Sequence, residues 1–221
     1  YAYVASMASW KSPYILGGSN PMLVEVPGLV AGNLTWEKVR TTDVGLDLIL
    51  LNNRLNFSGD IYRRDTRDML TTGKVLPSVL GTGIPPENSA DLKTTGFELT
   101  VSWRDKFDLA GKPLQYSIDF NLSDSRSKII KFSNPTGTLT TFYEGMKIGE
   151  VWGLKVKGLY TTDEEAKNGP DQTEILMNPS LYPTTAGTLN YEDLNKDGRI
   201  TRGSYTLNDH GDLTVIGNTE P

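Results

Sequence analysis

The first half of the chain contains four segments in which every second residue is apolar, and in the last three of them most of the residues between are polar. They are residues 44–51, 55–62, 97–103 and 116–123. Alternation with a period of two predicts a β-strand that has one apolar face and one polar face. Asn52-Asn53-Arg54 separates the first two segments, and a polar stretch from Arg104 to Pro113 separates the second two. Each pair is therefore predicted to form an antiparallel hairpin.

Two other parts of this first half carry turn-forming residues and predict loops. Residues 1–33 are rich in Gly, Pro, Ser and Tyr, and we expect loop with short strands at Tyr14–Leu16 and Met22–Val26. Residues 63–94 are charged and turn-rich, and we expect a long connection between the two hairpins.

The second half of the chain, from about Ser125, breaks into short apolar pieces between Gly, Asn, Asp and Pro residues. Thr162 and Glu165 have the spacing of a capping box, which predicts one short helix there. No segment has the length of the helix in a βαβ unit, which argues against a parallel α/β fold. The expected fold class is all-β, built from antiparallel hairpins with long surface loops and one short helix.

Two architectures explain strands with one apolar face. A soluble β-sandwich buries that face in its core, and a membrane β-barrel turns it toward lipid. The longest apolar run, Val44–Leu51, is too short for a membrane helix, so any crossing would be made by strands. Aromatic residues near the ends of the apolar faces (Phe97, Trp103 and Tyr116) and the alternation of short turns with long loops favour the barrel.

Composition and charge exclude several other functions. The net charge of −5 comes without a long basic run, so nucleic acid is not an expected partner. The sequence has no Cys and therefore no disulfide, thiolate metal site or cysteine nucleophile. The first residues do not have the pattern of a signal peptide, and we expect the chain to begin inside a longer protein.

No motif in the sequence predicts an enzyme, and we expect no catalytic residues. His210 is the single His, and beside Asp209 and Asp212 in a Gly-containing loop it is expected to be a solvated loop residue. Adjacent acids suggest glycosidase chemistry only where a fold holds two carboxylates across a cleft. Four aromatic residues in the loops could stack on sugar rings, although we favour a core or interface role; they are Tyr143, Trp152, Tyr160 and Tyr182.

Several sequence segments, in one order, resemble a known family. They are NLTWEKVRTTDVGLDLILLNNRLNFSGDIYRRDTRDML (33–70), NSADLKTTGFELTVSW (88–103), YEDLNKDGRI (191–200) and VIGNTEP (215–221). They are similar to the corresponding motifs of TonB-dependent outer-membrane receptors of the SusC or RagA type from Bacteroidetes. The similarity extends over the chain from about Tyr14 onward. Among the two architectures above, it favours the barrel.

The resemblance implies a fold, a location and partners. Residues 1–221 would be part of a large transmembrane β-barrel, and residues 125–221 mainly an extracellular-loop region. The plug domain, the TonB-contacting segment and the closing strands would lie outside this sequence. The whole receptor would import glycans or peptides across the outer membrane, with TonB and a SusD-like lipoprotein as partners. The alternative is a soluble, secreted, calcium-stabilised β-sandwich that binds carbohydrate.

One loop has the spacing of a calcium site. Asp193, Asn195 and Asp197 followed by Gly198 match the first half of an EF-hand loop, in which oxygen ligands at positions one, three and five surround the ion. Position twelve, which normally supplies a bidentate acid, is Ser204. The EF-hand-like loop therefore covers residues 193–204 but lacks its closing ligand.

The family resemblance supplies a candidate for the missing acid. Its motif has an acid shortly before the final Ile-Gly-Asn, and here the nearest match is Asp212. The predicted structural Ca²⁺ ligands are Asp193, Asn195, Asp197, the Arg199 carbonyl, Thr201 and Asp212. The alternative is a turn rich in Asp and Asn that binds no ion, because these residues favour turns in any case.

Overall fold

The computed structural model describes residues 4–32, 34–73 and 77–220. The chain divides into two compact units. Unit 1 comprises Tyr1–Ser123 and Ile130–Ser133, and unit 2 comprises Asp124–Ile129 and Asn134–Pro221. Among the described residues, no helix has the length and apolar character needed to cross a membrane.

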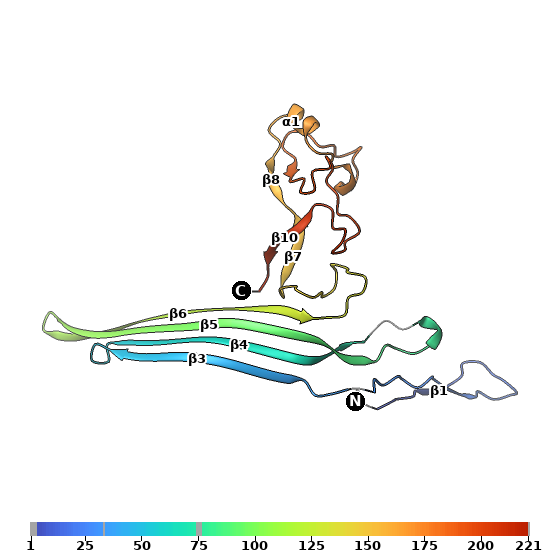
Figure 1. Ribbon diagram of the computed structural model, residues 1–221, viewed down its shortest axis with the longest axis horizontal. Helices are drawn as coiled ribbons and strands as arrows, with labels where there is room; N and C mark the ends of the chain where they lie inside the picture. Colours follow the sequence, from blue (N-terminus) through green and yellow to red (C-terminus); the bar gives the residue numbers. More distant parts are fainter. Residues whose placement is uncertain (1–3, 33, 74–76, 221) are drawn as a thin grey trace. The chain divides into compact units, whose positions relative to one another are not determined.

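The main element of unit 1 is a four-stranded sheet in which consecutive strands are neighbours (Figure 1). Its strands are β3 (Lys38–Leu50), β4 (Leu55–Thr72), β5 (Pro86–Leu109) and β6 (Lys112–Lys131). The pairs β3–β4 and β4–β5 are antiparallel. The prediction of two successive hairpins from alternating residues is confirmed.

Tight turns join β3 to β4 and β5 to β6. Asn52 and Asn53 have φ values of 53° and 66°, as expected of Asn in a turn. Ala110 and Gly111 have φ values of 53° and 76°, which is the left-handed conformation of a type I′ turn. The second turn is therefore much shorter than the stretch from Arg104 to Pro113 that the sequence predicted.

The connection between β4 and β5 is also shorter than predicted. The expected loop over residues 63–94 is wrong for most of its length, because β4 runs to Thr72 and β5 starts at Pro86. Residues 74–76 of that prediction lie outside the described residues. Charged residues occupy both faces here, which hid the alternation, and ion pairs such as Arg63–Asp65 (2.9 Å) hold them. A strand needs apolar residues on one face only where that face is removed from water, in a protein core or against lipid.

A small second sheet in unit 1 pairs β1 (Ser9–Lys11) with β2 (Met22–Val24). The predicted strand at Met22–Val26 is thus confirmed over its first part. The predicted strand at Tyr14–Leu16 is wrong, since these residues belong to no strand and Leu16 makes a single bridge to Ser19 across the turn at Gly17–Gly18. Residues 1–3 and 33 of the predicted loop lie outside the described residues.

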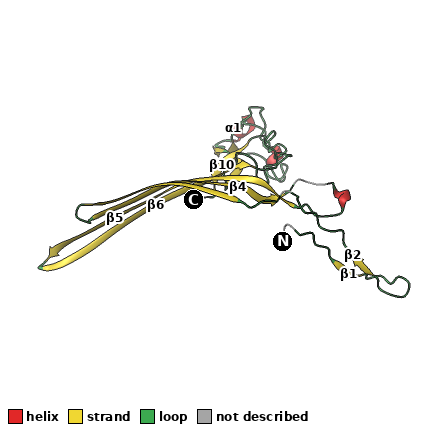
Figure 2. Cartoon of the chain, turned by 60° about the horizontal axis from the view of Figure 1, so that its bottom comes forward, coloured by secondary structure: helices red, strands yellow, loops and turns green. Residues whose placement is uncertain are grey.

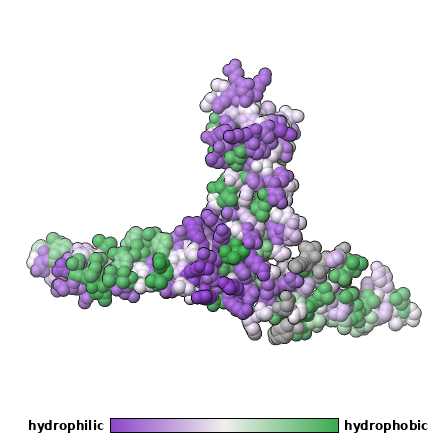
Figure 3. All heavy atoms as spheres, viewed as in Figure 1, coloured by the Kyte–Doolittle hydropathy of each residue, from purple (hydrophilic) through white to green (hydrophobic). Residues whose placement is uncertain are grey.

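The four-stranded sheet separates apolar from polar side chains. Leu48, Phe57 and Val101 are aligned across three strands, and so are Val44, Ile61 and Phe97. Many of these side chains are exposed, with values of 64% for Val44 and 63% for Ile61. In Figure 3 hydrophobic residues gather over the turn end of this sheet. A β-sandwich would bury this face under a second sheet.

Unit 2 is mostly loop and turn with short strands (Figure 2). Its two small antiparallel sheets pair β7 with β10 and β8 with β9. The elements are β7 (Glu150–Leu154), β8 (Val156–Leu159), α1 (Asp163–Asn168), the 3₁₀ turn η2 (Thr173–Ile175), β9 (Leu189–Tyr191) and β10 (Leu213–Asn218). A second 3₁₀ turn, η1 (Ser78–Leu80), belongs to unit 1.

The predicted helix cap is confirmed at the start of α1. The Glu165 amide donates to the Thr162 hydroxyl oxygen at 3.1 Å. The Glu165 carboxylate in turn accepts bonds from the amide and hydroxyl of Thr161, at 2.8 and 2.7 Å. These bonds lower the pKa of Glu165 below its usual value, first through the Thr161 hydroxyl. The cap satisfies helix donors that would otherwise lack partners.

A small core holds unit 2 together. Its most deeply buried side chains are Tyr160, Ile200, Leu213 and Asp212, each with 2% exposure or less. Three of them are apolar or aromatic, and the fourth is a carboxylate that belongs to the candidate metal site. The core therefore lies against the residues whose chemistry the sequence singled out.

Candidate functional site

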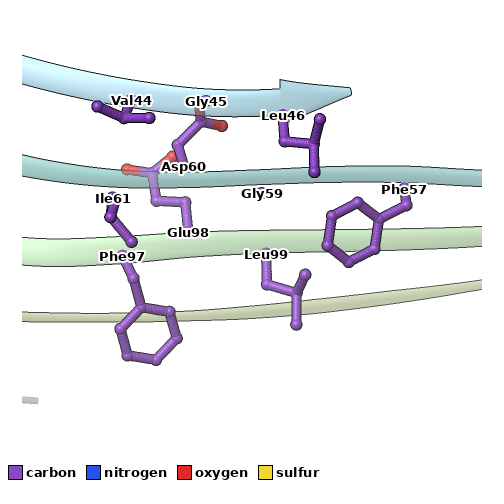
Figure 4. A pocket seen from close by; sticks show the side chains of 10 residues that line it. All are labelled: Val44, Gly45, Leu46, Phe57, Gly59, Asp60, Ile61, Phe97, Glu98 and Leu99. Carbon is purple, nitrogen blue, oxygen red and sulfur yellow. The ribbon is translucent and has the colours of Figure 1, made fainter. Parts of the chain in front are cut away.

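The apolar face of the four-stranded sheet carries a shallow hollow of about 450 Å³ (Figure 4). It lies on unit 1, and its apolar lining is Val44, Leu46, Phe57, Ile61, Phe97 and Leu99. Gly59 lies between Leu46 and Leu99 in the strand alignment and has no side chain to fill the space. The Phe57 ring reaches toward it, because a Cβ at Gly59 would lie 3.2 Å from that ring. An exposed apolar surface of this kind is typical of sites that contact a membrane, a ligand or another protein.

Aromatic residues mark the turn side of the apolar face. The Trp103 indole nitrogen donates to the Tyr116 hydroxyl at 3.1 Å. The Phe107 and Tyr116 rings meet edge to face, with their centroids 6.1 Å apart. Trp and Tyr that join an apolar surface to a polar hydrogen bond are typical of the interfaces of membrane proteins.

The polar face of the same sheet carries carboxylates. Asp60 and Glu98 are directly opposite each other on β4 and β5, an arrangement that like charges disfavour. Gly45 is opposite Asp60 on the other side, and a Cβ there would collide with the Asp60 carboxylate. Because Gly45 has no side chain, the Asp60 carboxylate can lie against β3 at this position. A polar hollow of about 280 Å³ adjoins them, lined also by Thr41, Asp43, Tyr62 and Arg64.

In unit 2, the predicted metal ligands at positions one, three and five lie in one turn. The Asp193 carboxylate accepts bonds from the amides of Lys196 (2.6 Å) and Gly198 (2.8 Å). Asn195 accepts from the Asp197 amide, and Asp197 accepts from the Arg199 amide. Gly198 has φ +83°, the left-handed conformation that the predicted sharp turn needs.

Asp212 joins this turn from outside it. Its Oδ1 atom accepts bonds from the amides of Leu194 (2.8 Å) and Asn195 (3.4 Å), and its Oδ2 atom accepts from the Thr201 amide (2.8 Å). The side chain is fully buried. The acid that the family motif indicated is thus brought to the loop, where it ties both ends of it together.

Ser204, at position twelve, faces another acid. Its amide and hydroxyl donate to Asp209 at 2.9 and 2.7 Å. The Ser204 hydroxyl is the main reason why the pKa of Asp209 lies below its usual value. Within the described part of the chain, no three acidic or His side chains are grouped so that they could hold a metal ion by themselves. A calcium site would need the Asn195 and main-chain oxygens as well.

Calcium binding to residues 193–212 stays a prediction. Each Asp oxygen that accepts one amide bond retains a lone pair for an ion, and the set Asp193, Asn195, Asp197 and Asp212 supplies oxygens only. We expect 1 mM Ca²⁺ to slow proteolysis within these loops in the full-length receptor by roughly tenfold relative to chelator, because an ion bound to the native loop stabilises it. Equal cleavage rates in Ca²⁺ and chelator would contradict the prediction, and Mg²⁺ provides the control.

Most of the aromatic side chains that the sequence analysis considered for sugar binding belong to the packing of unit 2. Tyr143 and Tyr160 are 7% and 2% exposed, which confirms a core role for these two. The Trp152 indole donates to the Tyr143 hydroxyl, which donates to Glu150. Burial, followed by the bond to Glu150, raises the pKa of Tyr143 to about 12, so this hydroxyl keeps its proton. Tyr182, in contrast, is 65% exposed.

His210 belongs to the same packing. Its ring lies 5.5 Å from the Trp152 ring, between centroids. Among the described residues, its buried Nδ1 atom has no hydrogen-bond partner. The expectation of a solvated His210 holds only in part, because the side chain is half-buried and one side of its ring faces Trp152. No sequence pattern indicated this contact, since the two residues are far apart along the chain.

Comparison with known proteins gives consistent matches. A family model described as "TonB dependent receptor-like, beta-barrel" matches residues 9–217. TonB-dependent receptor P3 of Formosa agariphila is 27% identical over 230 residues, which cover 98% of this chain and 21% of that protein. TonB-dependent receptor SusC of Bacteroides thetaiotaomicron is 27% identical over 101 residues, or 46% of this chain and 10% of that protein. The chain thus spans about a fifth or less of the length of these relatives.

A solved structure has a similar fold. It is the RagAB peptide importer in its closed-closed state, which matches 77% of this chain and 18% of that chain. The TM-score is 0.53 and the sequence identity is 24%. The same importer in its open-open state gives a TM-score of 0.53 at 23% identity. At this identity the likeness establishes the fold.

Proposed function

Because the chain belongs to the TonB dependent receptor-like β-barrel family, we propose that it forms part of the barrel wall of an outer-membrane importer driven by TonB. The observation that carries the proposal is the separation of faces on strands β3–β6. Side chains on one face are apolar and exposed, and side chains on the other are polar. Barrel strands in outer membranes have this pattern, with lipid outside and a polar lumen inside.

The orientation in the membrane follows from the lengths of the connections. Both tight turns lie at one end of the four-stranded sheet, and the longer β4–β5 connection lies at the other (Figure 1). Outer-membrane barrels have short periplasmic turns and longer extracellular loops. We therefore place the turns after Leu50 and Leu109 in the periplasm. Residues 125–221, which comprise the last part of β6 and the chain that follows it, would then be mainly an extracellular loop region.

The proposed importer takes up glycans or peptides together with a SusD-like lipoprotein. Similarity to a receptor named SusC and to a structure described as a peptide importer supports this class of cargo. The described part of the sheet has both acidic and basic groups on its polar face, as a lumen for hydrated solutes requires. The protein acts in transport, and we assign it no catalytic role.

Uptake by whole cells tests the proposal. We expect deletion of the receptor gene to abolish uptake of one class in a panel of labelled oligosaccharides and oligopeptides. Deletion of tonB should abolish the same uptake, because the outer membrane itself has no energy source. Uptake that needs the receptor but persists without tonB would contradict a TonB-driven importer. Recovery of the receptor in the soluble fraction of lysed cells would contradict its place in the membrane.

A further inference from the structure

Unit 2 contains a hollow of about 420 Å³ that the proposed barrel wall does not explain. It lies between the end of α1, the segment Pro170–Thr173 and the segment 176–184. Its polar lining is Lys167, Asp171, Gln172, Thr173 and Thr184. Leu176 and the prolines at 170, 179 and 183 form its apolar wall. The volume is in the range of small-ligand sites in proteins.

Gln172 is the main evidence that this hollow is a binding site. It is 3% exposed, although Gln is rarely buried. Its amide nitrogen donates to the hydroxyl of Tyr160 at 2.8 Å, and Tyr160 is itself 2% exposed. The described residues provide no hydrogen bond to the Gln172 amide oxygen, which is not fully enclosed. An amide fixed at one end and free at the other is suited to pair with a ligand.

The walls of the hollow are held rigidly. The Asp171 amide donates to the Gly198 carbonyl at 2.9 Å, and the Ile200 amide donates to the Asp171 carbonyl at 2.7 Å. These bonds connect the segment next to Gln172 with the EF-hand-like loop. Proline fixes φ at three places in the wall. A site that is already ordered loses little entropy when a ligand binds.

Lys167 supplies a cation to the hollow, beside the Asp171 carboxylate, whose Oδ1 atom accepts a bond from the Thr173 amide at 3.0 Å. Lys167 is exposed in the last turn of α1, and no salt bridge within the described ranges neutralises it. An ammonium group of this kind pairs with a carboxylate. Together, a cation, a buried amide and an apolar proline wall match the carboxylate, the backbone amide and the side chain of a peptide terminus.

We propose that this hollow binds the carboxyl-terminal end of a short peptide, with its carboxylate at Lys167 and a backbone amide at Gln172. The inference rests on the proposed importer function and narrows its cargo at this site to peptides. No aromatic ring lines the hollow, whereas sugar rings are commonly held against aromatic faces. Met177 and Leu181, both exposed on the segment that forms the rim, offer apolar contacts to further residues of the peptide.

Calorimetry with the purified full-length receptor tests the proposal. The probes are tetra-alanine with a free carboxylate, the same peptide with an amidated end, and maltotetraose. We expect tetra-alanine to bind and amidation to weaken binding at least tenfold. Lys167→Ala should weaken binding to a similar degree, and Thr184→Trp should block the hollow without changing its charge. Lys157→Ala, on the exposed strand β8, is the matched control and should bind as the unaltered receptor does.

Several outcomes would overturn the inference. Binding of tetra-alanine that neither Lys167→Ala nor Thr184→Trp weakens would place the peptide elsewhere. Binding of maltotetraose that Thr184→Trp abolishes, without any binding of tetra-alanine, would make the hollow a sugar site. TonB-dependent uptake measured on the same variants separates the peptide site from the importer function. Normal uptake without peptide binding in the hollow contradicts the peptide site alone. Peptide binding here without any TonB-dependent uptake contradicts the importer function instead.

Discussion

Replacing Leu99 with Arg is expected to prevent most of the receptor from reaching its folded state in the outer membrane. Leu99 is aligned with Leu46 and Gly59 on the apolar face of the sheet. An Arg on the lipid face near the middle of the bilayer costs about 2–4 kcal/mol in barrel stability. The measurement is the fraction of receptor in the outer-membrane fraction that resists unfolding by SDS at room temperature.

The matched control is Thr100→Arg. Thr100 is the next residue along β5, is aligned with Ser58, and lies on the polar face at the same depth. Because this face is proposed to line a polar lumen, the control should fold to at least half of the unaltered level. Equal losses for the two variants, or a larger loss for Thr100→Arg, would contradict the assignment of the faces.

The second large effect is expected for Asp212→Ala in unit 2. The substitution removes the acceptor of three main-chain amides, those of Leu194, Asn195 and Thr201. A buried amide without an acceptor costs about 1–3 kcal/mol. We expect the free energy of local opening to fall by about 3 kcal/mol, so that hydrogen exchange at the amides of Leu194 and Thr201 accelerates roughly 100-fold.

The exchange experiment needs a second acid from the same loop. Asp197→Ala is suitable, because the Asp197 side chain is exposed and accepts one main-chain bond, from Arg199. In the presence of chelator it should accelerate exchange by less than tenfold. If the two substitutions have the same effect in chelator, the buried carboxylate of Asp212 does not organise the loop. Any additional loss caused by Asp212→Ala only in Ca²⁺ would report its predicted role as a ligand.

The hairpins were predictable because a strand with one face removed from water has an apolar residue at every second position. Apolar residues at every second position located the inner parts of β3 to β6. The same rule missed the strand extensions from Arg63 to Thr72 and from Pro86 to Thr95, where charges occupy both faces. Those extensions are held by main-chain pairing and ion pairs such as Lys38–Asp68, at 2.9 Å. Such contacts join residues far apart in sequence and leave no periodic pattern.

The site was predictable where the chemistry is local. The capping bond between Thr162 and Glu165, and the turn at Gly198, follow from residues a few positions apart. Long-range contacts were not predictable from the chain alone. The contact between the His210 and Trp152 rings and the bond between Gln172 and Tyr160 depend on how loops pack together. The approach of Asp212 to the loop was indicated by a family motif and not by its spacing.

The alternating faces of β5 provide the most direct test of the whole account. Spin labels would be placed singly at residues 97–103 of the full-length receptor in lipid vesicles. We predict that labels at Phe97, Leu99, Val101 and Trp103 collide mainly with oxygen dissolved in lipid. Labels at the three residues between them should collide mainly with a water-soluble nickel complex. Accessibility without a period of two, or with the opposite phase, would contradict a barrel wall with this face toward lipid.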